Sequence, residues 1–153
     1  MAGLKLKVPP VAQGLLALIL IWLSGRFWPL YRIEIVSRNA VSLGIILLGV
    51  VVGAAGVCAF IRLRTTVDPR YPDKATRLVV GGVYKYSRNP MYLAILLVLV
   101  GVTVYLGALS SLLVVFLFVV TINRYQIVPE EQSLLRKFGD AYRQYTERVR
   151  RWI

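Results

Sequence analysis

The sequence predicts an all-α integral membrane protein with four transmembrane helices, the last two forming a short helical hairpin, followed by amphipathic cytoplasmic helices. Hydrophobic residues make up 58% of the 153 residues and the mean hydropathy is +0.66, values too high for an ordinary soluble domain. The apolar residues are gathered into blocks of membrane length. The 19 Lys+Arg, against 7 Asp+Glu, stand mostly between and after those blocks.

We predict one domain whose spans cover residues 8–28, 39–61, 91–106 and 108–123. The first span follows Lys5 and Lys7, as in a secretory signal peptide, but no small-x-small cleavage site comes after it. The second has 23 uncharged residues, enough to cross a hydrocarbon core of about 30 Å. The uncharged block at 91–123 is too long for one span, so we expect a turn at Gly107 to divide it into two helices.

The basic residues orient these spans. The N-terminus, the connector at 62–90 and the tail at 124–153 share one side and hold 16 of the 19 Lys+Arg. Cytoplasmic loops carry such an excess, so both termini are expected in the cytoplasm, with the bacterial inner membrane as the expected location. A basic surface also suits nucleic acid, but this distribution favours membrane lipids as partners and no nucleic acid.

Small residues recur in the second span at Gly49, Gly53 and Gly56. Small residues four apart let two helix backbones approach closely. One interpretation is internal packing against the third or fourth span. The other is a homodimer face, so the chain is predicted to be a monomer or a homodimer.

The tail after the hairpin is amphipathic. Pro129 suits the start of a helix, Glu130 and Glu131 favour its first turn, and Gly139 ends it. The next helix carries an apolar stripe made of Tyr142, Tyr145, Val149 and Trp152. With arginines on its other faces, we expect this helix to lie on the membrane surface or over the preceding loops.

Polar side chains able to hold a charged ligand gather at two places, directly before the third span and directly after the hairpin. The candidates are Gly82, Tyr84, Arg88, Asn89, Pro90, Tyr92, Arg124, Glu130 and Glu131. The chain has no histidine, which removes an imidazole base and argues against a zinc or iron site, so no metal site is predicted.

Each candidate also has a purely structural explanation. Asn89 and Pro90 suit the N-cap and first residue of a helix. Arg88 fits the positive-inside rule, and Tyr84 and Tyr92 fit an interfacial aromatic belt. These explanations leave the combination of the two separated groups unexplained.

The combined pattern resembles the integral-membrane methyltransferases that include isoprenylcysteine carboxyl methyltransferases and phospholipid N-methyltransferases. Their pattern is Gly-x-Tyr-x-x-x-Arg-His-Pro-x-Tyr, a helical hairpin, then Glu-Glu-x-x-Leu and Phe-Gly-x-x-Tyr-x-x-Tyr. The resemblance runs from Leu78 to the C-terminus, with Asn89 in place of the usual His. It implies S-adenosylmethionine as methyl donor and a lipid or other lipophilic small molecule, with a carboxylate, thiol or amine acceptor, as substrate.

The resemblance also implies roles for the residues. Arg88 would clasp the cofactor's carboxylate, and Glu130 or Glu131 would take its ammonium or its ribose hydroxyls. Arg88, Tyr92 and Glu130 are the predicted catalytic residues. The predicted cofactor contacts are Gly82, Tyr84, Arg88, Asn89, Pro90, Tyr92, Arg124, Glu130 and Glu131. Methyl transfer from a sulfonium is an in-line displacement that needs alignment and a dry pocket more than an acid or base.

Two other classes of protein stay open. A nicotinamide-dependent membrane reductase related to sterol reductases shares a similar C-terminal arrangement, but this chain is short and lacks the additional spans. A non-catalytic small membrane lipid-binding protein is the second alternative.

The asymmetry of the basic residues gives a topology prediction. A reporter fused after Ile153 should be active only as a cytoplasmic fusion, and one inserted near Arg32 only as an exported fusion. Paired alkaline phosphatase and fluorescent-protein fusions at both sites measure this. A C-terminal reporter active only outside the cytoplasm contradicts the four-span arrangement.

Overall fold

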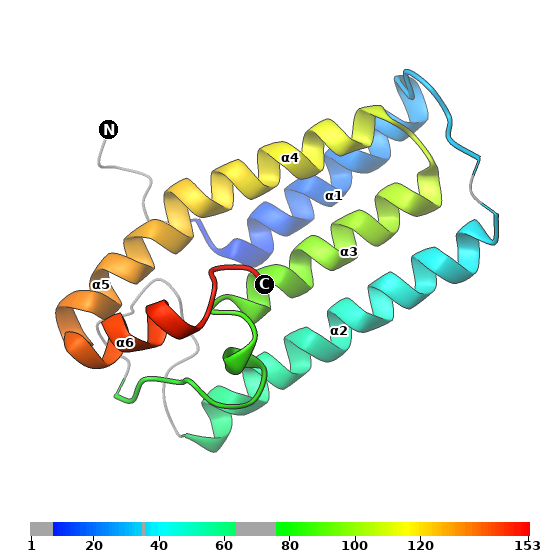
Figure 1. The fold of residues 1–153 in the computed structure, drawn as a ribbon. Coiled ribbons are helices and arrows are strands. Elements are labelled where there is room, and N and C mark those ends of the chain that lie inside the picture. Colours follow the sequence, from blue (N-terminus) through cyan, green and yellow to red (C-terminus); the bar gives the residue numbers. More distant parts are fainter. Residues whose placement is uncertain (1–7, 35, 64–75) are drawn as a thin grey trace.

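The computed structural model describes residues 8–34, 36–63 and 76–153, and every regular element among them is helical (Figure 1). Lys5, Lys7 and residues 64–75 of the predicted 62–90 connector therefore lie outside the described residues. The elements are α1 (Pro10–Phe27), α2 (Arg38–Arg62), the 3₁₀ turn η2 (Gly82–Lys85), α3 (Pro90–Leu106), α4 (Ser110–Ile122), the π-helical turn η3 (Asn123–Ile127), α5 (Val128–Phe138) and α6 (Asp140–Arg148).

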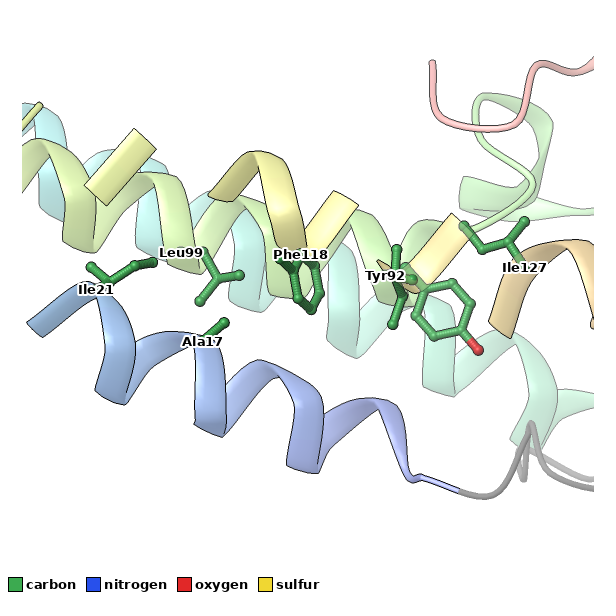
Figure 2. Close-up of a cluster of buried hydrophobic side chains, with 7 residues drawn as sticks. Ala17, Ile21, Tyr92, Leu99, Phe118 and Ile127 are labelled. Carbon is green, nitrogen blue, oxygen red and sulfur yellow. The ribbon is translucent and has the colours of Figure 1, made fainter. Parts of the chain in front are cut away.

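Four apolar helices form the body of the molecule. α3 lies between α2 and the pair made by α1 and α4, and it contacts all three (Figure 1). Buried side chains of α1, α3 and α4 make one hydrophobic core that includes Ala17, Ile21, Leu99 and Phe118 (Figure 2). The all-α prediction is confirmed.

The outer faces of these helices are apolar as well. Three helices are long and apolar enough to cross a membrane, at 10–27, 38–62 and 110–138, and α3 is a shorter apolar helix of 17 residues. Large hydrophobic side chains point outward along the three long helices, among them Leu15, Leu47, Leu113 and Phe116. A helix that is apolar on every side suits a hydrocarbon solvent. The protein is therefore an integral membrane protein.

Glycines set the distance between α2 and α3. A Cβ atom added at Gly49 would lie 2.9 Å from the Ala94 carbonyl oxygen, and one at Gly53 would lie 3.1 Å from the Ala94 Cβ. Across the same interface, the Ser42 hydroxyl donates to the Gly101 carbonyl oxygen at 2.8 Å. The small residues of the second span thus pack internally, against the third span.

At the end of the bundle where α3 turns into α4, hydrogen bonds join the hairpin turn to the segment that follows α1. Gly107 ends α3 with a positive φ of 63°, a conformation that L-residues with a side chain rarely adopt. Its carbonyl oxygen accepts a hydrogen bond from the Ile33 N–H at 2.8 Å, and the Leu109 N–H donates to Tyr31 at 3.0 Å. These bonds tie Tyr31 and Ile33, which follow α1, to the turn of the hairpin, whose predicted position is confirmed.

The end of the hairpin differs from the prediction. We predicted a span that stops near Asn123 and a separate tail helix that begins at Pro129. Instead the helix runs without a break from Ser110 to Phe138, through a π-helical turn at 123–127. Proline removes one helical hydrogen bond and its ring crowds the carbonyl four residues before it. The wider π turn, in which the Val128 N–H bonds to the Asn123 carbonyl, directly precedes Pro129 and gives room for its ring.

The glycine interface leads to a stability test. We expect Gly49→Ala to lower the free energy of unfolding by about 1–3 kcal/mol, because the added methyl group meets backbone and α2 must move away from α3. Gly44→Ala is the matched control, since a Cβ there has nothing within 4 Å and alanine is the better helix former. Melting temperatures in detergent, followed by circular dichroism, compare the two. Equal melting temperatures would show that the close approach is unimportant.

Candidate functional site

The site lies at the end of the bundle where α2 ends and α3 begins, and it starts with the turn η2. Gly82, with a φ of 61°, opens this turn, which places Tyr84 inside the protein. The Tyr84 ring packs edge-on against Phe60 of α2, with 5.5 Å between ring centroids. Its carbonyl oxygen accepts a hydrogen bond from the Tyr145 hydroxyl at 2.7 Å. Tyr84 therefore joins the loop before α3 to both α2 and α6.

The C-terminal helix covers this loop. Tyr142, Tyr145 and Val149 form a second buried cluster, against which Leu78, Leu134 and Phe138 pack. After α6 ends, the Arg150 carbonyl accepts a bond from the Arg88 N–H at 3.0 Å. Of the two predicted positions for the amphipathic tail, the one over the loops is observed (Figure 1).

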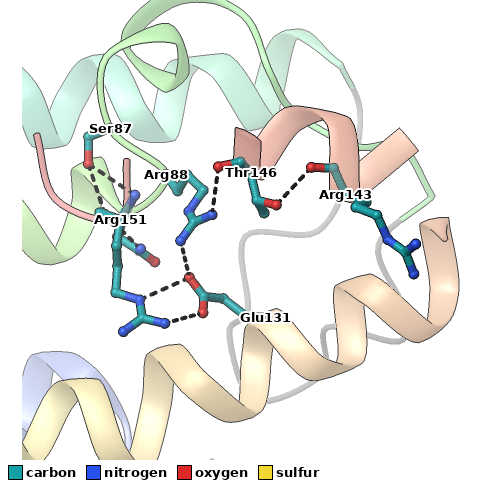
Figure 3. A network of polar contacts seen from close by, with 7 residues as sticks. Ser87, Arg88, Glu131, Arg143, Thr146 and Arg151 are labelled. Carbon is teal, nitrogen blue, oxygen red and sulfur yellow. Dashed lines mark hydrogen bonds and ion pairs between the residues drawn. The ribbon is translucent and has the colours of Figure 1, made fainter. Parts of the chain in front are cut away.

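Three charged side chains meet between the loop, α5 and the C-terminal segment. The Glu131 carboxylate pairs with Arg88, at 3.0 Å from Nη2 to Oε1, and with Arg151, at 2.6 Å from Nη2 to Oε2 (Figure 3). A second nitrogen of Arg151, Nε, donates to Oε1 at 3.1 Å. Arg88 Nη1 donates to the Thr146 carbonyl at 3.4 Å. The Arg88 Nε is buried and has no hydrogen-bond partner among the described residues.

Asn89 takes the N-cap position of α3, but its side chain makes no capping bond. Its Nδ2 instead donates to the Arg151 carbonyl oxygen at 2.9 Å, and the Ser87 hydroxyl reaches the same oxygen at 3.5 Å. The capping explanation offered for this side chain is therefore wrong. Pro90 follows as the first residue of α3 and is fully buried.

A second carboxylate lies one residue before the first. The Tyr92 hydroxyl donates a hydrogen bond to Glu130 Oε1. Tyr92 is buried and belongs to the core between α1, α3 and α4 (Figure 2). The structure thus separates the two adjacent glutamates, since Glu131 is paired with arginines while Glu130 is bonded to a phenol.

Burial keeps the phenols of Tyr84 and Tyr145 neutral. Burial raises the pKa of Tyr145 to about 12, although Arg88 opposes this. Burial, together with Tyr145 and Glu130, raises the pKa of Tyr84 far above its ordinary value. Both phenols keep their protons at physiological pH.

The structure brings most of the predicted site residues together, but not all of them. Arg124 lies exposed on the π turn and has no hydrogen bond or ion pair with a described residue. Sequence reasoning missed Arg151, Ser87 and Thr146. Of these, only Arg151 left a signal, as one of several arginines in a basic tail, and nothing in its spacing distinguished it from its neighbours.

This architecture defines a class of protein: an integral membrane helical bundle with a partly buried, charged site at one end. The chain belongs to the phospholipid methyltransferase family, whose profile matches residues 37–141. The family predicted from the two motifs is thereby confirmed. Family membership indicates that the protein is a membrane methyltransferase.

Two relatives match parts of the chain. A Haemophilus influenzae protein described as uncharacterized is 48% identical over 63 residues, which cover 41% of this chain and 100% of that protein. A protein-S-isoprenylcysteine O-methyltransferase of Schizosaccharomyces pombe is 34% identical over 77 residues, which cover 50% of this chain but 33% of the yeast protein. No solved structure matches the chain.

The bond between Asn89 and Arg151 can be tested by substitution. We expect Asn89→Ser and Asn89→Asp, both good capping residues, to lower stability by about 1–3 kcal/mol, because each leaves the Arg151 carbonyl without its amide donor. Asn89→His retains an N–H donor and should lose less. Melting temperatures of the three variants give the order. If the Ser variant were as stable as the parent, the hydrogen bond from the Asn89 amide to the Arg151 carbonyl would contribute nothing to stability.

Proposed function

We propose that the protein transfers a methyl group from S-adenosylmethionine to a lipid or other lipophilic small molecule at the cytoplasmic surface of the membrane, expected to be a bacterial inner membrane. The observation that carries this proposal is the meeting of Arg88, Tyr92, Glu130 and Glu131. These residues come from two motifs separated by a helical hairpin, and they lie in one site next to the bundle core. The family and the name of the yeast relative supply the reaction type.

The residues present fit the proposed methyl donor. Its amino-acid end is a zwitterion, and its ribose carries two hydroxyls. Arg88 has a buried Nε that makes no hydrogen bond to any described residue, and this N–H group could donate to a carboxylate. Glu130 is bonded to one phenol and to no described arginine, so its carboxylate suits the ammonium or the hydroxyls. Glu131 is already held by two arginines, which makes it a less suitable contact than Glu130.

When bound, the sulfonium supplies an electrophilic methyl group, and the chain's own residues align and shield the reaction. Arg88 and Glu130 would hold the two charged ends, which fixes orientation without acid or base chemistry. Tyr84 and Tyr145 stay neutral and exclude water from the loop. If the acceptor is an ammonium, its proton would go to Glu130, whose carboxylate accepts a hydrogen bond from Tyr92.

A lipophilic acceptor has a short path to this site. Tyr92 touches the site through its hydroxyl and the hydrophobic core through its ring. The polar site and the apolar interior of the bundle therefore meet at one side chain. We propose that the acceptor enters sideways from the bilayer, so that its reactive group reaches the site while its chain stays among apolar side chains.

Cofactor choice separates this proposal from the two alternatives. Equilibrium binding of radiolabelled S-adenosylmethionine and of NADPH to the detergent-purified protein should show binding of the first alone. NADPH binding would favour the reductase, and binding of neither would favour a lipid-binding protein. Feeding labelled methionine to cells with and without the gene, followed by lipid extraction, would then identify the acceptor.

The proposed contacts give expected losses of affinity. Arg88→Ala and Glu130→Ala should each weaken S-adenosylmethionine binding by roughly ten- to a hundredfold, because each removes a charge-assisted contact worth about 1.5–3 kcal/mol. Arg148→Ala and Glu147→Ala are matched controls on the exposed face of α6 and should bind as the parent does. Titration calorimetry measures all four. Parent-like binding by both site variants would mean that the pocket has been misplaced.

A further inference from the structure

The two arginines share Glu131 unequally. Arg151 binds the carboxylate through two nitrogens, with Nη2 at 2.6 Å from Oε2 and Nε at 3.1 Å from Oε1. Arg88 reaches only Oε1, through one nitrogen at 3.0 Å (Figure 3). Bidentate pairing is the stronger geometry. Arg151 is therefore the main partner of Glu131, and Arg88 is a secondary one.

The cluster carries an unbalanced charge. Two guanidinium groups and one carboxylate sum to a net charge of +1. The side chains of Arg88 and Glu131 are only 13% and 18% exposed, and that of Arg151 is 38% exposed. A shielded positive charge is stabilised by an anion, and within the described part of the chain the Arg88 Nε has no hydrogen-bond partner. Glu130 does not supply that anion, since its described partner is Tyr92.

We propose that Arg151 is a positioning residue: by neutralising Glu131 it leaves Arg88 free to bind the carboxylate of the methyl donor. This inference rests on the proposed function and adds a residue from outside both family motifs. Without Arg151, Glu131 would turn to Arg88 as its sole guanidinium partner, and the cluster would become neutral. The carboxylate of the methyl donor would then meet an Arg88 that is already neutralised by Glu131.

The backbone holds Arg151 at this place. Its carbonyl oxygen accepts bonds from the Asn89 amide at 2.9 Å and from the Ser87 hydroxyl at 3.5 Å. The neighbouring Trp152 packs against the hydrophobic core. The loop that carries Arg88 therefore also holds Arg151, the residue that limits how far Glu131 neutralises Arg88. Asn89 acts on the site through this contact.

A purely structural role for Arg151 predicts a different effect of its substitution on ligand binding. If Arg151 only fastened the C-terminal segment, its loss would disturb the whole pocket and weaken every ligand alike. If Arg151 instead neutralises Glu131 and so leaves Arg88 free, its loss should weaken the binding only of ligands that carry a carboxylate. Methylthioadenosine shares the adenosine of S-adenosylmethionine but lacks the amino-acid end, so the two ligands separate these roles.

The test measures both ligands by titration calorimetry with the full-length protein in detergent. Arg151→Gln should weaken S-adenosylmethionine about tenfold or more and change methylthioadenosine less than twofold. The double variant Arg151→Gln with Glu131→Gln restores the net charge of +1 and should recover most of the lost affinity. Arg151→Lys keeps the charge without the bidentate geometry, and its affinity for S-adenosylmethionine should lie within a few-fold of the parent's. This variant also provides a test if Arg151→Gln does not fold.

Each other outcome has a distinct meaning. Equal losses for both ligands, no loss in Arg151→Gln, or a double variant that binds no better than the single one would each overturn the role of Arg151. A parent protein that binds methylthioadenosine but not S-adenosylmethionine would instead refute the proposed function. If Arg151→Gln does not fold, a tenfold loss in Arg151→Lys confined to S-adenosylmethionine would contradict a role carried by charge alone.

Discussion

The Glu131 carboxylate, held between Arg88 and Arg151, joins three parts of the chain that are distant in sequence. Arg88 belongs to the loop before α3, Glu131 to α5, and Arg151 to the segment after α6. In a chain made mostly of apolar helices, even partly buried charges are costly unless they are paired. This pairing is therefore a strong constraint on how the C-terminal third of the protein folds back over the loop. The rest of the site depends on the resulting arrangement.

A second constraint acts from inside the bundle. The glycines of α2 let α3 approach closely, with Ala94 directly against Gly49 and Gly53. The position of α3 then sets the positions of Asn89 at its cap and Tyr92 in its first turn. Lipid does not drive apolar helices together, so close packing of small residues has to do so. The charged site is thus placed by the close packing of small residues between α2 and α3.

The sequence was informative where spacing alone carries the signal. The lengths of the apolar blocks predicted the helices and the turn at Gly107, and the two motifs predicted that Arg88 would meet the glutamates. Spacing failed where the answer depends on contacts in three dimensions. Asn89 has the residue type of a helix cap, and only the position of the Arg151 carbonyl shows that its amide bonds elsewhere. Arg151 looked like any other basic residue of the tail, because pairing with Glu131 is a property of the fold.

The continuity of the helix from Ser110 to Phe138 was missed for a related reason. A proline such as Pro129 often marks the first turn of a helix. It does not mark a start when the residues before it are already helical. Here the π turn at 123–127 accommodates it, so a single helix runs from the hairpin turn to the charged cluster. Rigid continuity fixes Glu130 and Glu131 relative to the bundle. Side chains built on a helix are held more precisely than those on a loop. The loop that carries Arg88 is then positioned by bonds to a rigid partner, and this division explains why the C-terminal segment is bonded to the loop at Ser87, Arg88 and Asn89.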